Sequence, residues 1–370
     1  MKVTDLPVRF TAEKHLVPLW RANEIYDDTL LFVGEEGEST LAFLPTGKII
    51  VRSYTLDTVY EEGKDYTVHG KIVRRVKGSA MPFIKEEDYF RSTPAEVGIG
   101  VDNAYAEIPL NGQYYLAYGE KDTFTAKEVA VSYVTEENDF SFVPQASEKL
   151  APLKERFKKQ GGGAVLFYGD SITVGCNASA TEYGGELPPY TPSWAQLTGT
   201  YLAKACGVRL ETVNKAVGGW RAADGIREME ERVLSRSYDL LVLAFGMNDG
   251  LTEHDVWEKE MRTLIEAFLD RNPNGFVLLV STMFPNRQSN WRIKQVGQEE
   301  ILAKLAAEYE RVGLARGSSA FSALEATGKR TRDFLANNIN HPNDFGVRLY
   351  AEVILAVLVG EESLKEAIRL

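Results

Sequence analysis

The segment AVLFYGDSI, from Ala164 to Ile172, decides the fold of this chain. Its first five residues are apolar without alternation, which is typical of a strand buried on both faces. Similar apolar runs occur at Leu240–Phe245 and Phe276–Val280, and a more polar one lies at Arg209–Val213. Helical patterns lie between these runs. We therefore predict an α/β fold with a parallel, doubly wound sheet, and ligands bound beyond the carboxyl ends of its strands.

Helix signals frame this sheet. The charged segment from Ser147 to Gln160 has a helical apolar spacing and ends at a run of three glycines. A second helix is predicted after Thr191 as N-cap, with Pro192 at its first position and Gly207 as C-cap.

The first part of the chain has a different pattern. Short β-favouring pieces such as Lys48–Arg52 and Tyr66–Val68 alternate with turn residues between Leu31 and Val143. Such spacing is typical of an antiparallel sandwich or barrel. We expect an all-β, sandwich-like accessory domain over residues 1–145 and the α/β domain over residues 146–370.

Composition excludes several classes of protein. The 370 residues include 42 basic and 53 acidic ones, and the net charge of −11 argues against nucleic-acid binding. No apolar stretch approaches the ~18 residues needed to cross a bilayer. The first seven residues lack the apolar core of a secretory signal. Two cysteines, Cys176 and Cys206, are too few for a disulfide scaffold or a cysteine-based zinc site. We expect a cytoplasmic protein without metal, cofactor, nucleic-acid or membrane partner, and we leave homo-oligomerisation open.

Polar residues follow three of the predicted strands. Ser171 stands where a strand enters a helix, which suits a nucleophile beside converging backbone N–H groups and also suits a plain helix cap. The segment NKAVGG at 214–219 lets the backbone approach a ligand closely, or it is an ordinary turn. In GMNDG at 246–250, Asn248 can donate a hydrogen bond to a developing oxyanion, although an asparagine in a loop is usually a turn residue.

The chain has four histidines, at positions 15, 69, 254 and 341. The first two lie in the β-rich part, and His254 begins an exposed helix. His341 lies in a loop of the α/β part, before the apolar helix predicted from Val347 to Val359. If Ser171 is a nucleophile, its base is a side chain that titrates near neutral pH, and His341 is the candidate. No Gly-x-Ser-x-Gly, Gly-x-Gly-x-x-Gly, P-loop or His-Glu-x-x-His motif competes.

Together, GDS at 169–171, NxAxxG at 214–219, GxND at 246–249 and NxxHP at 338–342 resemble the four sequence blocks of the SGNH (GDSL) hydrolase superfamily. The order and spacing are similar, and the resemblance covers about the last 220 residues. It implies a three-layer, flavodoxin-like α/β domain with a parallel sheet of about five strands. A β-domain ahead of such a domain is also similar to some bacterial carbohydrate esterases that remove acetyl groups from xylan.

The resemblance implies a role for each matching position. Ser171 Oγ attacks an ester carbonyl, and His341 takes its proton and returns it to the leaving alcohol. The backbone N–H groups of Ser171 and Gly219 and the side chain of Asn248 form the oxyanion hole.

One position departs from the superfamily. Asn338 stands where an acid is normal, three residues before the histidine. Either Asn338 or a backbone carbonyl steers His341 in a Ser–His dyad, or Asp333 supplies the acid, or catalysis has been lost. We favour the dyad.

The substrate-binding candidates are Asp170, Trp220, Phe284 and Trp291. The aromatic residues flank the site or the polar loop at 285–290, and they would stack on sugar rings or simply pack in their loops. The predicted function is a serine esterase that removes acetyl groups from sugars such as xylo-oligosaccharides. The alternatives are an acyl-thioesterase or lysophospholipase on the same fold, and a non-catalytic carbohydrate-binding protein.

Overall fold

The structure is a computed structural model that describes residues 1–92, 105–110 and 112–369. Its carboxyl-terminal part is built on a five-stranded parallel sheet in the order β12-β11-β13-β14-β15. These strands are β11 (Gly162–Gly169), β12 (Arg209–Asn214), β13 (Leu240–Ala244), β14 (Phe276–Val280) and β15 (Val312–Ala315). Numbered along the chain, this is the flavodoxin-like order 2-1-3-4-5. The predicted parallel α/β sheet is confirmed.

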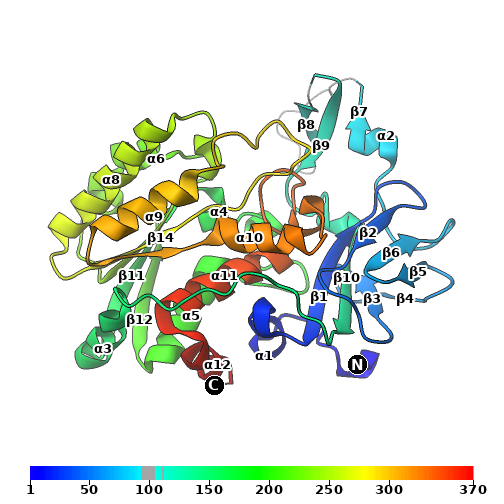
Figure 1. Cartoon of the computed structure of the whole chain (residues 1–370), viewed down its shortest axis with the longest axis horizontal. Coiled ribbons are helices and arrows are strands. Elements are labelled where there is room, and N and C mark those ends of the chain that lie inside the picture. Colours follow the sequence, from blue (N-terminus) through cyan, green and yellow to red (C-terminus); the bar gives the residue numbers. More distant parts are fainter. Residues whose placement is uncertain (93–104, 111, 370) are drawn as a thin grey trace.

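Helices cover both faces of this sheet (Figure 1). Side chains of β11 alternate between them: Leu166 and Tyr168 belong to one apolar cluster, and Val165 and Phe167 to the other. One face carries α6 (Ala222–Arg227), α8 (His254–Arg271) and α9 (Gln298–Glu308). The other carries α3 (Ala151–Gln160), α5 (Trp194–Cys206), α11 (Asp344–Val359) and α12 (Glu361–Arg369), with α10 (Gly317–Ala326) near α11. Burial on both faces explains why the strands are continuous apolar runs.

Helix α5 begins two residues later than its sequence suggests. Ser193, not Thr191, is the N-cap, and its side chain forms a reciprocal capping box with Gln196. The helix ends as predicted at Gly207, whose φ of 66° is in the left-handed region. The Ser-x-x-Gln pairing satisfies two helix-end donors, so it outweighs the preference of proline for the first helical position.

The amino-terminal part is rich in antiparallel strands, as expected. Among the residues that the structure describes there, three small sheets have the orders β1-β10-β3-β4, β2-β6-β5 and β7-β9-β8. The strands are β1 (Glu24–Leu31), β2 (Glu38–Thr40), β3 (Ile50–Ser53), β4 (Val59–Tyr60), β5 (Tyr66–His69), β6 (Ile72–Arg75), β7 (Phe90–Arg91), β8 (Tyr105–Leu110), β9 (Tyr114–Gly119) and β10 (Glu128–Val134). Two short helices accompany them, α1 (Ala12–His15) and α2 (Glu86–Tyr89). We refer to residues 1–145 as the β region; a domain boundary at residue 145 stays a prediction.

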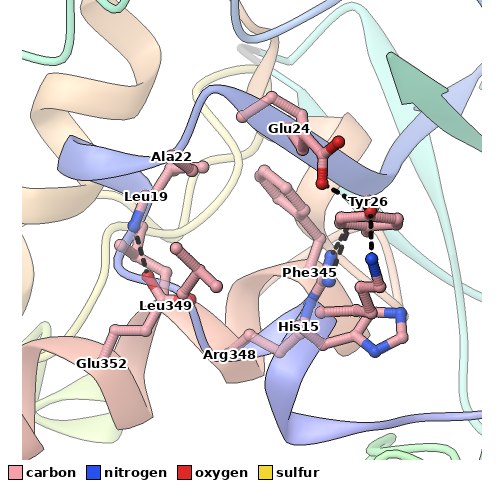
Figure 2. A pocket seen from close by; sticks show the side chains of 12 residues that line it. His15, Leu19, Ala22, Glu24, Tyr26, Phe345, Arg348, Leu349 and Glu352 are labelled. Carbon is pink, nitrogen blue, oxygen red and sulfur yellow. Dashed lines mark hydrogen bonds between the residues drawn. The ribbon is translucent and has the colours of Figure 1, made fainter. Parts of the chain in front are cut away.

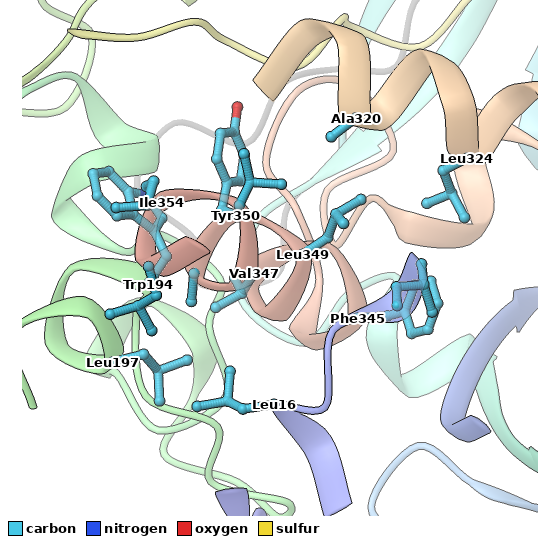
Figure 3. Packing of buried hydrophobic residues seen from close by; sticks show 14 of the residues in the cluster. Leu16, Trp194, Leu197, Ala320, Leu324, Phe345, Val347, Leu349, Tyr350 and Ile354 are labelled. Carbon is cyan, nitrogen blue, oxygen red and sulfur yellow. The ribbon is translucent and has the colours of Figure 1, made fainter. Parts of the chain in front are cut away.

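The β region and the α/β part share apolar contacts. The largest cluster of buried residues contains Leu16 and Trp20 together with Trp194 and Tyr350. Figure 3 shows Leu16, just after α1, close to Leu197 of α5 and to the side chains of α11. A second shared cluster places Ile339 of the α/β part among Tyr89 and Leu116 of the β region. The loop that carries His341 is therefore packed against the β region.

A small cavity lies between the amino-terminal segment and α11 (Figure 2). It encloses about 20 Å³, which is room for a water-sized molecule and not for an ester substrate. Glu352 lines it, and its carboxylate accepts a 2.9 Å hydrogen bond from the Leu19 N–H. Burial raises the pKa of Glu352 to about 8, although that hydrogen bond and Arg348 favour its charged form. The buried acid thus holds a proton at neutral pH.

Among the helices of the described ranges, none has the length and apolar character that a membrane crossing requires.

Candidate active site

Ser171 is the first residue of the short helix α4 (Ser171–Val174), directly beyond the carboxyl end of β11. Asp170 is its N-cap, and the Asp170 carboxylate accepts a 3.0 Å hydrogen bond from the Ile172 N–H. The residue before Asp170 has to be glycine, because a Cβ at position 169 would lie 2.3 Å from the Ala244 carbonyl oxygen of the neighbouring strand. The strand end and the helix start fix Ser171, whose residue is only 4% exposed.

Asp170 is itself buried, and burial raises its pKa to about 6 although the Ile172 N–H and His341 favour the charged form. Its side chain serves the α4 cap. Asp170 is predicted from the sequence to bind substrate, but its buried carboxylate has no open surface for a substrate to contact.

The histidine loop precedes α11 and is organised by one buried side chain. The Asn337 side-chain oxygen accepts backbone hydrogen bonds from Ile339, Asn340 and His341 at 3.1, 2.9 and 2.9 Å. This tight turn directs the imidazole toward α4. His341 Nε2 lies 2.9 Å from Ser171 Oγ. The pairing of these two residues, expected from their positions in the sequence, is present in the structure.

The other ring nitrogen of His341 has two acceptors. Nδ1 lies 2.7 Å from Asn177 Oδ1 and 3.2 Å from Glu120 Oε2. The amide orientation of Asn177 follows from its other contact, because its Nδ2 donates to the Lys121 carbonyl at 3.0 Å. Because Nδ1 faces two acceptors, the proton of the neutral ring lies on Nδ1. Nε2 is then unprotonated and accepts a hydrogen bond from the Ser171 hydroxyl.

Glu120 comes from the β region, one residue beyond β9. Its second oxygen, Oε1, accepts hydrogen bonds from the Tyr118 hydroxyl and, at 3.2 Å, from Asn337 Nδ2. Burial opposes ionisation of Glu120, but the hydrogen bonds from His341, Tyr118 and Asn337 prevail and lower its pKa to about 2. A full negative charge therefore faces the imidazole at neutral pH.

The two residues proposed from sequence to steer His341 do not contact its ring. Asn338 Nδ2 donates to the Ala117 carbonyl at 2.8 Å, and its side-chain oxygen accepts from the Tyr89 hydroxyl at 3.1 Å. Asp333 accepts from the Leu31 N–H at 2.9 Å and from the Ser39 hydroxyl at 2.6 Å. Both side chains are occupied by the β region instead, Asn338 at β9 and Asp333 at β1 and β2. The expected backbone carbonyl is likewise replaced at Nδ1 by Asn177 and Glu120.

The turn that carries the predicted oxyanion donor Gly219 lies beside Ser171. A Cβ on the exposed Gly218 would lie 3.9 Å from Ser171 Cβ, so the double-glycine turn borders the nucleophile. Gly219 has a φ of 78°, in the region that glycine favours. Asn248 is half-buried, and its Nδ2 donates to the Trp220 carbonyl at 3.0 Å. One N–H of the Asn248 amide is thus fixed at this turn, and its second N–H is the one that would donate to an oxyanion.

Asp249 supports the same turn from beneath. It is buried, and one of its oxygens accepts from the Ala222 N–H at 3.1 Å. Burial raises its pKa to about 7, with the nearby charge of Asp170 adding to the shift.

The aromatic candidates are placed differently. Trp220 packs its ring edge-on to Tyr168 and under the Arg232 guanidinium, 4.8 Å from the ring centre. The Arg292 guanidinium lies 4.1 Å from the centre of the Phe284 ring, so one face of Phe284 is covered. Trp291 is 37% exposed. Of the three side chains, Trp291 alone keeps an exposed ring.

Residues 167–349 match the model of the GDSL-like lipase/acylhydrolase family. The matched segment begins within β11 and ends within α11, so it contains both Ser171 and His341. The match covers just under half of the chain and marks a GDSL-like lipase/acylhydrolase domain within it. No curated protein matches the chain.

Several solved structures are similar in fold. A two-domain esterase (CEX) active on acetylated mannans, crystallised with mannopentaose, is 22% identical, with 61% of this chain and 55% of that chain covered at a TM-score of 0.47. Axe2, an acetylxylan esterase from Geobacillus stearothermophilus, is 21% identical, with coverages of 52% and 92% at a TM-score of 0.43. LAE5, an alpha/beta hydrolase from the metagenome of Lake Arreo, Spain, is 19% identical, with coverages of 55% and 96% at a TM-score of 0.44. The chain thus spans about half the length of the two-domain esterase.

Proposed function

We propose that this protein is a serine esterase that removes short acyl groups, acetyl foremost, from carbohydrates such as xylo-oligosaccharides. The observation that carries the proposal is the 2.9 Å contact between Ser171 Oγ and His341 Nε2, with Nδ1 of the same ring facing only acceptors. That arrangement supplies a hydroxyl nucleophile and a base of the correct tautomer.

The proposed reaction has two steps. Ser171 Oγ bonds to the ester carbonyl carbon while its proton moves to His341 Nε2, and the carbonyl oxygen becomes an oxyanion. The N–H groups of Ser171 and Gly219 and the side chain of Asn248 stabilise that oxyanion. The carbon–oxygen bond to the sugar then breaks, and the proton on Nε2 goes to the leaving alcohol. Water then attacks the acyl carbon while Nε2 takes its proton. The bond from that carbon to Oγ breaks, Nε2 returns the proton to Oγ, and acetate leaves.

Polarity beside the histidine loop supports a small acyl group on a polar substrate. The Asn286 N–H donates to the Ile339 carbonyl at 2.7 Å, and Asn286 Nδ2 donates to the Asn338 carbonyl at 2.8 Å. The loop at 285–290 is therefore attached to the histidine loop by amide groups. A long acyl chain would need an apolar channel, whereas a sugar has hydroxyl groups to pair with polar side chains. The exposed ring of Trp291 is a candidate for stacking on a sugar.

Acetate release from acetylated xylo-oligosaccharides tests the proposal, with wild type and Ser171→Ala measured side by side. We expect release by wild type and a loss of about 10³-fold or more in the variant. A matched control is Ser322→Ala, a change of the same size on α10. No release by wild type, together with measurable binding of the same sugars, would instead identify a carbohydrate-binding protein.

A series of p-nitrophenyl esters tests the acyl length. Rates that are highest for acetyl support the proposal. Rates that peak at octanoyl or longer would assign the site to a thioesterase or lysophospholipase.

A further inference from the structure

We infer that Glu120, a residue of the β region, supplies the negative charge that offsets the His341 imidazolium, while Asn177 positions the ring. The inference rests on the proposed function, and it assigns to two residues the work that a single aspartate near the histidine would do. Neither residue lies in the four sequence blocks that identify the hydrolase part.

The geometry divides the task between them. Asn177 Oδ1 is the nearer acceptor at 2.7 Å, and its amide is locked by the Lys121 carbonyl, so it fixes the direction of the Nδ1–H bond. An amide is neutral, however, and it cannot balance the charge that His341 gains when Ser171 is deprotonated. Glu120 Oε2, at 3.2 Å from the same nitrogen, provides the missing charge.

Glu120 is held in place from both parts of the chain. The Tyr118 hydroxyl donates to Oε1 from within β9, and Asn337 Nδ2 donates to the same oxygen from the histidine loop. Next to these contacts, Asn338 Nδ2 binds the Ala117 carbonyl. The end of β9 is thus attached to the histidine loop at Ala117 and at Glu120, and the carboxylate arrives with its orientation already set.

Other titratable groups near the ring do not take this role. Asp170 faces the imidazole from the α4 side, but its carboxylate is used by the helix cap and its pKa is raised to about 6 by burial. The Cys176 thiol faces Glu120, and burial raises its pKa to about 12, so it is neutral. The Tyr118 hydroxyl is a donor to Glu120, and its pKa is raised by burial and by that carboxylate. Glu120 is therefore the one ionised acid hydrogen-bonded to His341 among the residues that the structure describes.

The test uses the full-length protein in four forms: wild type, Glu120→Gln, Asn177→Asp, and the double variant with both changes. Glutamine keeps the size and an acceptor oxygen of Glu120 but removes the charge. Aspartate at position 177 places a carboxylate 2.7 Å from Nδ1 in the native backbone, and like asparagine it tolerates the φ of 66° found there. The single Asn177→Asp variant controls for the lost donor to Lys121.

We expect Glu120→Gln to lower kcat about 10- to 100-fold with KM nearly unchanged, the range for a lost charged hydrogen bond. The acidic limb of its kcat/KM profile should move to lower pH, because the base has lost a stabilising charge. The double variant should regain at least about tenfold in kcat, because the charge has been returned at a new position. If Glu120 served only to hold the structure together, the acidic limb would not shift and the double variant would not recover activity. Failure to observe the shift, or failure to observe the recovery, would overturn the inference.

A readout that needs no turnover separates this inference from the proposed function. The ¹⁵N signals of the His341 ring, followed against pH, report when the ring takes up its second proton. That transition should move to lower pH in Glu120→Gln and return in the double variant. If wild type hydrolyses no ester, the proposed function fails, and the NMR series alone supports or overturns the charge assignment.

Discussion

Lys329 Nζ lies 2.5 Å from Asp28 Oδ1, and both side chains are fully buried. The lysine belongs to the segment after α10 and the aspartate to β1, so the ion pair joins the α/β part to the β region. Asp28 Oδ2 also accepts from the Ala42 N–H and the Tyr133 hydroxyl, both at 2.8 Å. Such saturation by hydrogen bonds is what makes a buried ion pair tolerable.

Breaking this pair on one side should be costly. Lys329→Met leaves the Asp28 charge buried without its cation, and we expect the free energy of unfolding to fall by about 3–5 kcal/mol. The double variant Asp28→Asn/Lys329→Met removes both charges and should recover a large part of that loss. Chemical denaturation of the three proteins measures the difference. Equal losses in the single and double variants would mean that the charges are not coupled.

Asp333 should matter for stability and not for chemistry. Its two oxygens accept from the Leu31 N–H and the Ser39 hydroxyl, so Asp333→Ala leaves two buried donors without partners. We expect a loss of about 2–5 kcal/mol in unfolding free energy. The kcat of the folded fraction should stay within about threefold of wild type. A fall in kcat of several orders of magnitude, with stability unchanged, would return Asp333 to the role of hidden acid.

Asn248 should act mainly in the transition state. Removing its NH₂ group by Asn248→Ala should lower kcat by about 10²- to 10³-fold and leave KM nearly constant. Steady-state kinetics with an acetyl ester provide the measurement. Asn274→Ala, at an exposed position just before β14 and at the end of the sheet opposite Ser171, is the matched control and should retain wild-type rates. A large rise in KM at constant kcat would instead place Asn248 in ground-state binding.

The buried acid of the small cavity should give stability a pH dependence. Folding raises the pKa of Glu352 from 4.5 to about 8 by burial, so between these values the folded protein holds a proton that the unfolded chain has released. The contribution of Glu352 to stability is therefore fully present below about pH 4.5 and declines as the pH rises toward about 8. Glu352→Gln should flatten this decline while keeping an acceptor for the Leu19 N–H.

Urea denaturation at several pH values between about 5 and 8 checks the effect of Glu352. Glu362→Gln, on the exposed face of α12, is the control and should follow wild type. A steeper decline in Glu352→Gln than in wild type would contradict the proposed proton.

The parts of this structure that follow local rules were predictable from the sequence. Buried parallel strands need continuous apolar residues, and the strand-to-helix turn at Ser171 needs its preceding glycine, so both leave local signals. The pairing of Ser171 with His341 followed from the order of four short motifs. Glu120 left no such signal, because its position depends on how β9 packs against a loop more than two hundred residues later. Asn177 had a weak one, as an asparagine after Gly175 in a turn where left-handed backbone is common.

The attachment of Asn337 to Glu120 has a practical consequence for anyone who clones this protein by its recognisable motifs. An expression fragment trimmed to residues 167–349 would retain the serine, the histidine and the oxyanion turn, yet it would leave behind the carboxylate opposite the imidazole. It would also expose Lys329 and Asp333, whose partners lie in the discarded portion. Assays of such a fragment would therefore underestimate any esterase activity that the 370-residue chain has.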